Sequence, residues 1–182
     1  EGKNSNNDKR KRNKKRSSIS DFAGDFEGYA NGSDKLSYSQ INDVKRKKIC
    51  RQHKLPNDTA VYYFREYSSD WTFAVSEVGL SFMKENSETK KLESIKFPWN
   101  IVDKVEYDSE DDVFFVYHEN DDEPMEFGSY KLIKGSDECY EFADLLSQMA
   151  ALVVNIGDAI IDELSALEDE HKLAESIKRC KE

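Results

Sequence analysis

The chain of 182 residues carries 27 Lys and Arg against 37 Asp and Glu, a formal net charge of −10, and 37% of its residues are hydrophobic. No stretch approaches the ~20 apolar residues of a membrane span, and residues 1–16 contain no hydrophobic segment of the secretory type. Of the 41 Val, Ile, Leu and Phe residues, 8 lie in residues 1–56 and 33 in residues 57–182. Composition therefore predicts one foldable unit preceded by a poorly hydrophobic third.

The N-terminal third is basic. Residues 1–16 hold eight Lys and Arg against Glu1 and Asp8, a local charge of +6, so the remainder carries −10 − 6 = −16. We predict that residues 1–56 form a mostly disordered tail or linker, with a short helix over residues 39–53. The candidate nucleic-acid contacts are cations of this tail: Lys9, Arg10, Lys11, Arg12, Lys14, Lys15 and Arg16. The alternative is a solvated tail that binds nothing.

Short strands dominate from residue 57 onward. Runs of β-branched and aromatic residues alternate with polar turns at a spacing of roughly 8–12 residues, which is typical of a small antiparallel sandwich or barrel. The pattern predicts seven strands, at residues 59–66, 71–76, 80–83, 92–97, 101–107, 113–117 and 125–127.

The C-terminal part has helical spacing. Apolar residues recur every three or four positions over residues 137–153, and Gly157 with Asp158 predicts a break before a second amphipathic helix that ends near residue 178. The apolar stripe of that second helix, Ile160, Leu164 and Leu167, is the candidate partner-binding surface. It either folds back on the barrel, pairs with a second copy in a homo-oligomer, or docks on a protein partner.

Two segments resemble a known family. Residues 72–82, TFAVSEVGLSF, and residues 95–105, IKFPWNIVDKV, are similar to paired motifs of bacterial PH-like and GRAM-like domains, which have the pleckstrin-homology superfold. The resemblance implies a seven-stranded antiparallel barrel over residues 57–153 that is closed by one helix, with residues 154–182 as an added helix. In these segments Gly79 permits a hairpin turn, Pro98 ends a strand, and Trp99 fills the core.

Binding of phosphoinositides, which a PH-like fold invites, is not expected. Arg65 is the only cation of the first predicted hairpin, and it stands beside Glu66 and Asp70, so this hairpin lacks the cations that pair with phosphates. The three cysteines, Cys50, Cys139 and Cys180, form no C-x-x-C motif, which predicts neither a zinc cluster nor a disulfide framework and favours a reducing, cytoplasmic location, or a nuclear one in a eukaryote.

The residues indicate no chemistry of a catalytic kind. The sequence contains no G-x-S-x-G, no phosphate-binding glycine loop and no calcium loop spacing in its acidic run around residues 103–126. We therefore predict no enzyme, cofactor or metal, and interpret the chain as a PH-like adaptor or scaffold module that binds a protein within a larger intracellular assembly. Two alternatives remain: a nucleic-acid- or chromatin-associated factor that binds through the basic tail, and an acidic inhibitor or immunity-type protein.

Overall fold

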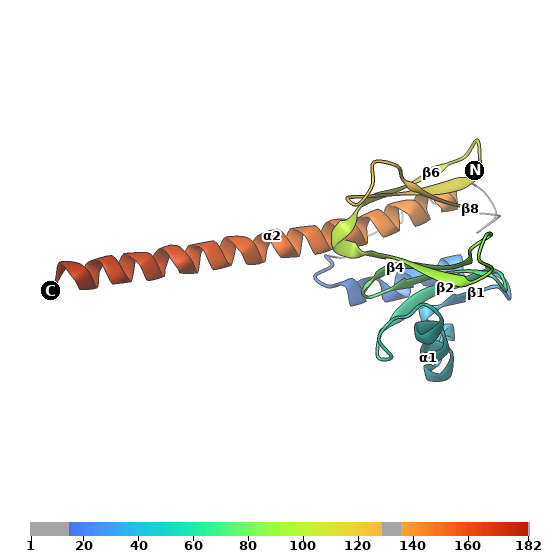
Figure 1. The fold of residues 1–182 in the computed structure, drawn as a ribbon, viewed down its shortest axis with the longest axis horizontal. Helices are drawn as coiled ribbons and strands as arrows, with labels where there is room; N and C mark the ends of the chain where they lie inside the picture. The colour runs from blue at the N-terminus through green and yellow to red at the C-terminus, as the bar shows by residue number, and fades with distance from the viewer. Residues whose placement is uncertain (1–14, 129–135, 182) are drawn as a thin grey trace, which may run out of the picture.

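The computed structural model describes residues 15–128 and 136–181, and this part of the chain is mainly β with a long C-terminal helix (Figure 1). Within these residues eight strands form two antiparallel sheets, of order β1-β2-β3-β4-β5 and β6-β7-β8. The strands are β1 (Lys35–Ser37), β2 (Val61–Ser68), β3 (Trp71–Ser76), β4 (Gly79–Glu85), β5 (Leu92–Pro98), β6 (Val102–Asp108), β7 (Val113–His118) and β8 (Met125–Gly128). The helices are α1 (Asp43–Gln52), α2 (Ser136–Cys180) and the short 3-10 helices η1 (Ile19–Tyr29), η2 (Tyr38–Gln40) and η3 (Trp99–Ile101).

The seven predicted strands are confirmed as β2 to β8, each within about two residues of its expected bounds. They do not close into a barrel, because the described strands divide into two sheets with separate hydrogen-bond ladders. An eighth strand, β1, extends the first sheet by pairing Leu36 with Phe64 of β2.

Gly79 determines the turn between β3 and β4, and Pro98 with Trp99 determines the corner after β5. Gly79 has a φ of +153°, and a Cβ placed there would lie 2.1 Å from the backbone oxygen of Phe97, so only glycine fits without rearrangement. β5 ends at Pro98, and the buried Trp99 that follows donates its indole N–H to the Ser76 carbonyl at 3.0 Å. These contacts tie the corner between the two sheets to the β3–β4 turn.

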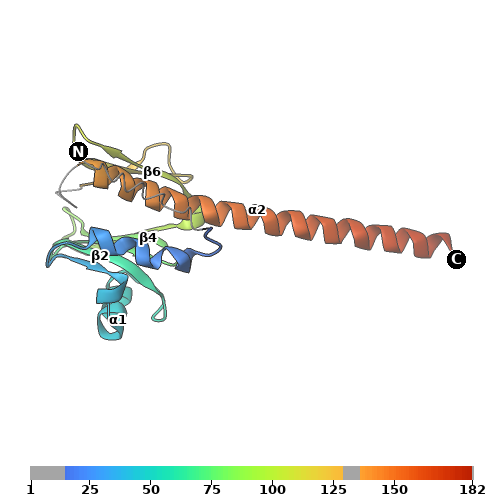
Figure 2. The same ribbon diagram turned by 180° about the vertical axis from the view of Figure 1, so that it is seen from behind.

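The core lies between the two sheets and is rich in aromatic residues. Phe114 and Phe127 of the second sheet stack with ring centroids 4.9 Å apart, and Phe127 lies 5.1 Å from Phe73 of the first sheet. The first half of α2 and η1 run side by side along the open side of this sandwich (Figure 2). Both therefore contribute to one hydrophobic core.

The prediction of a mostly disordered tail was wrong for the described residues before residue 57. Phe22 and Phe26 of η1 are buried, and the Phe26 ring lies 6.1 Å from that of Phe142 of α2. The expected short helix over residues 39–53 is confirmed as α1, which begins at Asp43 with Asn42 as its N-cap and packs on the outer face of the first sheet. Residues 1–14 lie outside the described part of the chain.

The predicted break near Gly157 was also wrong, because α2 runs without interruption from Ser136 to Cys180. No atom outside the helix backbone lies within 4 Å of a Cβ built at Gly157, and one glycine costs a helix only about 1 kcal/mol. By length and composition α2 could cross a membrane: an 18-residue window has a mean hydropathy of 1.4, with 22% of it buried in the fold. The overall composition of the chain does not indicate this window, and core helices of soluble proteins have the same length and composition.

Candidate functional site

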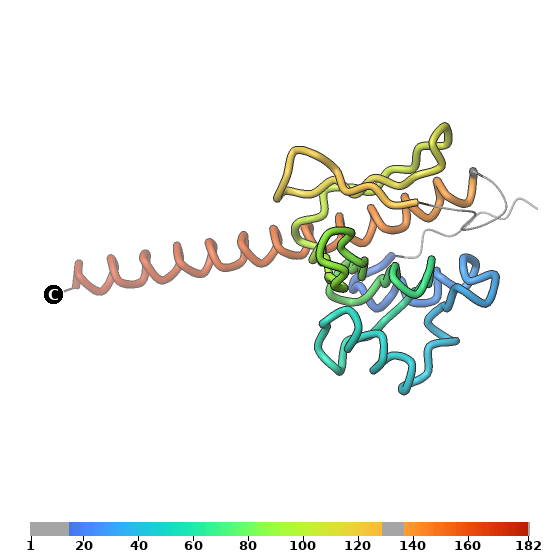
Figure 3. The backbone as a smooth tube through the Cα atoms, turned by 45° about the vertical axis from the view of Figure 1, so that its right-hand side comes forward, coloured from blue at the N-terminus to red at the C-terminus, as the bar shows by residue number. Residues whose placement is uncertain are grey.

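The second half of α2 extends away from the sandwich as a single helix (Figures 1 and 3). We call residues 154–180 the arm. Apart from Gly157, every residue of the arm is exposed, whereas Met149 and Ala150, one turn earlier, are completely buried. A helix rises about 1.5 Å per residue, so the arm reaches roughly 40 Å beyond the body.

The arm continues the helical face that packs in the core. Phe142, Leu146 and Met149 are buried at successive spacings of four and three residues. The same spacing leads through the partly buried Val153 to the arm residues Ile156, Ile160, Leu164 and Leu167. These four arm residues, which we call the stripe, are 39%, 50%, 60% and 60% exposed. One face of α2 is therefore a core face at one end and an uncovered apolar face at the other.

Acidic side chains border the stripe. At 100° per residue, Glu163 and Glu170 fall along one edge of the stripe, and Glu168 and Glu175 along the other. Glu168 pairs with Lys172 at 2.9 Å, and Glu175 lies 3.4 Å from His171. Between Asp158 and Glu170 the arm has six carboxylates and no Lys or Arg, which gives this apolar face a strongly negative surround.

The structure thus brings the three predicted partner-binding residues, Ile160, Leu164 and Leu167, together on one exposed face. Sequence reasoning missed Ile156, because the expected helix end at Gly157 separated it from the stripe. The three-and-four spacing that runs unbroken from Phe142 to Leu167 was the signal that could have identified it.

Of the predicted nucleic-acid contacts, the structure describes only Lys15 and Arg16. Arg16 forms an ion pair with Asp25 at 2.7 Å, and its guanidinium carbon lies 4.3 Å from the Phe22 ring centroid, so this side chain is held against η1. Lys15 is exposed. The other predicted nucleic-acid contacts lie outside the described residues: Lys9, Arg10, Lys11, Arg12 and Lys14.

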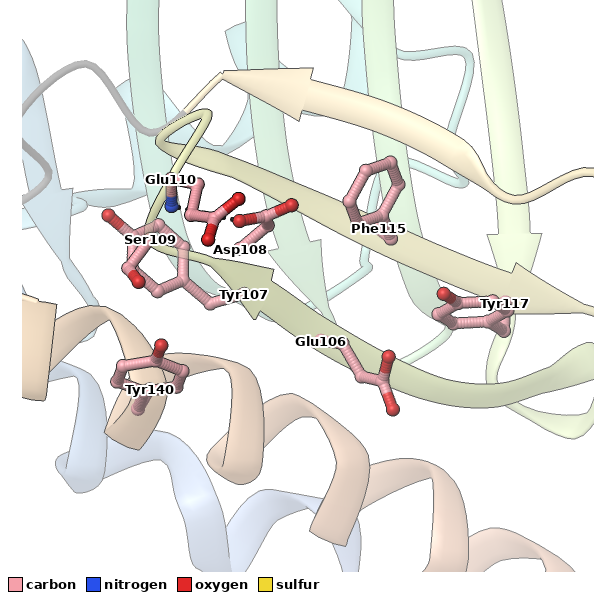
Figure 4. Close-up of a pocket in the computed structure, with 8 residues that line it drawn as sticks. All are labelled: Glu106, Tyr107, Asp108, Ser109, Glu110, Phe115, Tyr117 and Tyr140. Carbon is pink, nitrogen blue, oxygen red and sulfur yellow. Dashed lines mark hydrogen bonds between the residues drawn. The ribbon is translucent and has the colours of Figure 1, made fainter.

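A second feature is a shallow groove of about 460 Å³ on the outer side of the second sheet (Figure 4). Carboxylates from the β6–β7 hairpin stand beside aromatic rings from β7 and from the first turn of α2; the lining is Glu106, Tyr107, Asp108, Ser109, Glu110, Phe115, Tyr117 and Tyr140. At its border the Lys104 ammonium lies 2.7 Å from Glu106 and 4.8 Å from the Tyr117 ring centroid. The position of the Lys104 ammonium, beside a carboxylate and an aromatic ring, indicates that the groove favours binding of a Lys or Arg side chain.

A third cluster is buried and polar. His53, at the end of α1, has no exposed surface; its Nε2 lies 2.8 Å from Oγ1 of Thr72 and its Nδ1 lies 2.9 Å from Oγ of Ser81. Burial lowers the pKa of His53 from 6.5 to about 4, so the ring is neutral at pH 7. Both ring nitrogens already have hydroxyl partners, and the cluster fixes α1 to the first sheet.

Among the described residues no group of three or more His, Cys, Asp or Glu is placed to hold a metal ion. Cys50 and Cys139 are buried free thiols, and Cys180 is an exposed one. A comparison with protein-family models, with curated proteins and with solved structures found no match to this chain.

Proposed function

We propose that this protein is a non-catalytic adaptor or scaffold module of the PH-like, GRAM-like type, which binds a protein partner through the arm within a larger intracellular assembly. The observation that carries the proposal is the exposure of Ile160, Leu164 and Leu167 on a helix whose preceding turns are fixed in the core. An exposed apolar helix face of this length typically lies in the groove or along the helix of a partner.

The PH-like part of the proposal rests on topology. β2 to β5 form an antiparallel meander, β6 to β8 form a second one, and a helix follows that packs between them. The resemblance of residues 72–82 and 95–105 implies seven antiparallel strands followed by one helix, and β2 to β8 with α2 follow that order, although the strands form two sheets and not the implied closed barrel. β1, η1 and the arm are additions to that arrangement. An adaptor function fits a fold in which the core is complete before the arm begins.

The proposal is tested by capturing proteins from the source cell on the immobilised full chain and on a stripe variant, Ile160→Ser with Leu164→Ser and Leu167→Ser. A partner retained by the full chain and lost from the variant supports binding through the arm. Circular dichroism must show that the body of the variant is folded. Equal retention of every protein on both chains would contradict the proposal.

The acidic groove favours a second candidate, an acidic inhibitor that covers a basic surface. The groove combines Glu106, Asp108 and Glu110 with the half-exposed Tyr140, so it offers both charge and aromatic contact to Lys or Arg. Substituting Glu106 and Glu110 with Lys would abolish such binding and leave binding through the arm unchanged. If the partner still binds this groove variant and is lost only from the stripe variant, the arm is the functional surface.

A further inference from the structure

We infer that the occupant of the stripe is a basic amphipathic helix, in which leucine-like residues face the stripe and Lys or Arg face its glutamate borders. The inference rests on the proposed function and names the chemistry of the partner. It is argued from the apolar face, from the charges along its two edges and from the occupants that those charges disfavour.

The apolar face sets the shape of the occupant. Ile156, Ile160, Leu164 and Leu167 lie at helical spacing on a straight, exposed helix, and a second helix laid alongside can contact all four residues at once. An extended peptide would gain no backbone pairing here, because the N–H and C=O groups of a helix interior are already bonded within the helix. A partner helix also meets the end of the body, since the stripe continues into Val153 of the core face.

The charges along the edges set the chemistry. In a pair of helices packed along this stripe, Glu163 and Glu170 on one edge and Glu168 and Glu175 on the other face the flanking residues of the partner. Positive flanks form ion pairs across the interface, whereas negative flanks repel. The −16 charge of residues 17–182 adds long-range attraction for a positively charged partner.

Three other occupants fit less well. A second copy would place glutamates opposite glutamates in both the parallel and the antiparallel pairing. The basic N-terminal segment of this chain, residues 1–16, has no apolar side chain with which to cover the stripe. An anionic membrane surface would be repelled by the carboxylates, because Asp158, Asp162 and Asp169 line the face opposite the stripe as well.

The test uses the full chain and fluorescently labelled helical peptides of about four heptads. One peptide has Leu at its core positions with Lys on both flanks, and the other has the same Leu with Glu on both flanks. Fluorescence anisotropy is expected to show binding of the Lys peptide only, weakened about tenfold or more when salt is raised to about 0.5 M. Vesicles of phosphatidylcholine and phosphatidylserine are tested in parallel.

Matched variants on the same helix locate the site. Leu164→Ser should weaken binding of the Lys peptide by about 10- to 100-fold, while Leu173→Ser, at a residue that is 63% exposed but off the stripe, should leave it unchanged. Likewise Glu163→Lys with Glu170→Lys should abolish binding, and Asp162→Lys with Asp169→Lys, on the opposite face, should weaken it only a few-fold. These exposed substitutions do not touch the core.

Each contrary result has a distinct meaning. Binding of the Glu peptide as tight as that of the Lys peptide, lost in Leu164→Ser, would overturn the basic partner and leave the arm as a docking surface. Binding of neither peptide, or binding that Leu164→Ser does not change, would also overturn the inference; the stripe variant in the capture experiment then decides the proposed function separately. Sedimentation of the chain as a dimer that Leu164→Ser dissociates would assign the stripe to a second copy, and vesicle binding would assign it to a membrane.

Discussion

Protonation of the buried His53 is expected to destabilise the fold as pH falls. The ring has a pKa of about 4 in the folded chain, because burial disfavours the imidazolium, and an ordinary pKa near 6.5 when unfolded. The unfolded state therefore binds more protons between these two values, and stability rises with pH in that interval. The stability due to the neutral ring is complete above about pH 7.5, falls as pH decreases through 6.5, and stops falling below about pH 4.

The size of the effect follows from the two pKa values. Relative to pH 8, linkage predicts a loss of about 1 kcal/mol at about pH 5.5 and of about 2–3 kcal/mol at about pH 4.5. Urea unfolding followed by tryptophan fluorescence at these pH values measures the loss directly. Carboxylates also titrate near the lower pH. The loss of unfolding free energy in the natural chain is therefore compared with the loss in His53→Gln, and the difference between the two losses is assigned to the imidazole.

Two controls accompany this experiment. His53→Gln is expected to be less stable at pH 8 and to lack the component of acid sensitivity that is due to the imidazole. His171→Gln, at an exposed position of the arm, should keep the full pH dependence of the natural chain. An acid sensitivity that is identical in the natural chain and in His53→Gln would refute the reasoning, because the buried ring would then not be the titrating group.

Three further substitutions, two of them with a matched control substitution, test the packing. Gly79→Ala should cost about 2 kcal/mol or more in unfolding free energy, because Gly79 has a φ of +153° and the new Cβ meets the Phe97 oxygen. Its control, Gly157→Ala, should increase helix content without loss of stability. Thermal unfolding followed by circular dichroism distinguishes the two effects. Phe26→Ala should lower the free energy of unfolding in urea by about 3–5 kcal/mol, because η1 belongs to the core. Its control, Val44→Ala, should lower it by less than about 0.5 kcal/mol, because the Val44 side chain is 77% exposed. Equal losses of stability in the two variants would exclude η1 from the core. Ser147→Ala should cost about 1–2 kcal/mol and speed hydrogen exchange of the Val105 amide, because the Ser147 hydroxyl accepts from that N–H at 2.9 Å and donates to the Val105 carbonyl at 3.0 Å; an unchanged exchange rate would contradict this role.

The sequence predicted the strands well because their signals are local. Alternation in residues 71–76, the forced glycine at Gly79 and the stop at Pro98 each depend on neighbours within a few positions. The 3-10 helix η1 was missed because its burial depends on contacts with distant elements, such as that of Phe26 with Phe142. The i, i+4, i+7 spacing of Phe22, Phe26 and Tyr29 is helical, but in an Asp- and Gly-rich segment this spacing does not report the distant contact that buries them.

The candidate site was predicted in its residues and not in its geometry. The apolar spacing identified Ile160, Leu164 and Leu167, but three placements of their helix were equally compatible with that spacing. Folding back on the barrel requires a bend at Gly157, and the continuous helix instead directs the stripe away from the body. The body cannot cover the stripe from that position, which is why the arm rather than the sandwich became the candidate surface.

Hydrogen exchange over α2 tests the central claim, an arm that has no partner in the isolated chain and gains one by binding. For the full chain alone, amides of residues 156–180 are expected to exchange much faster than those of the buried turn around Met149, because an isolated helix frays without tertiary packing. Addition of the Lys-flanked peptide should protect residues 156–170 and leave the sandwich unchanged. Arm amides that are as protected as Met149 in the chain alone, or that stay unprotected with the peptide in excess, would contradict the account.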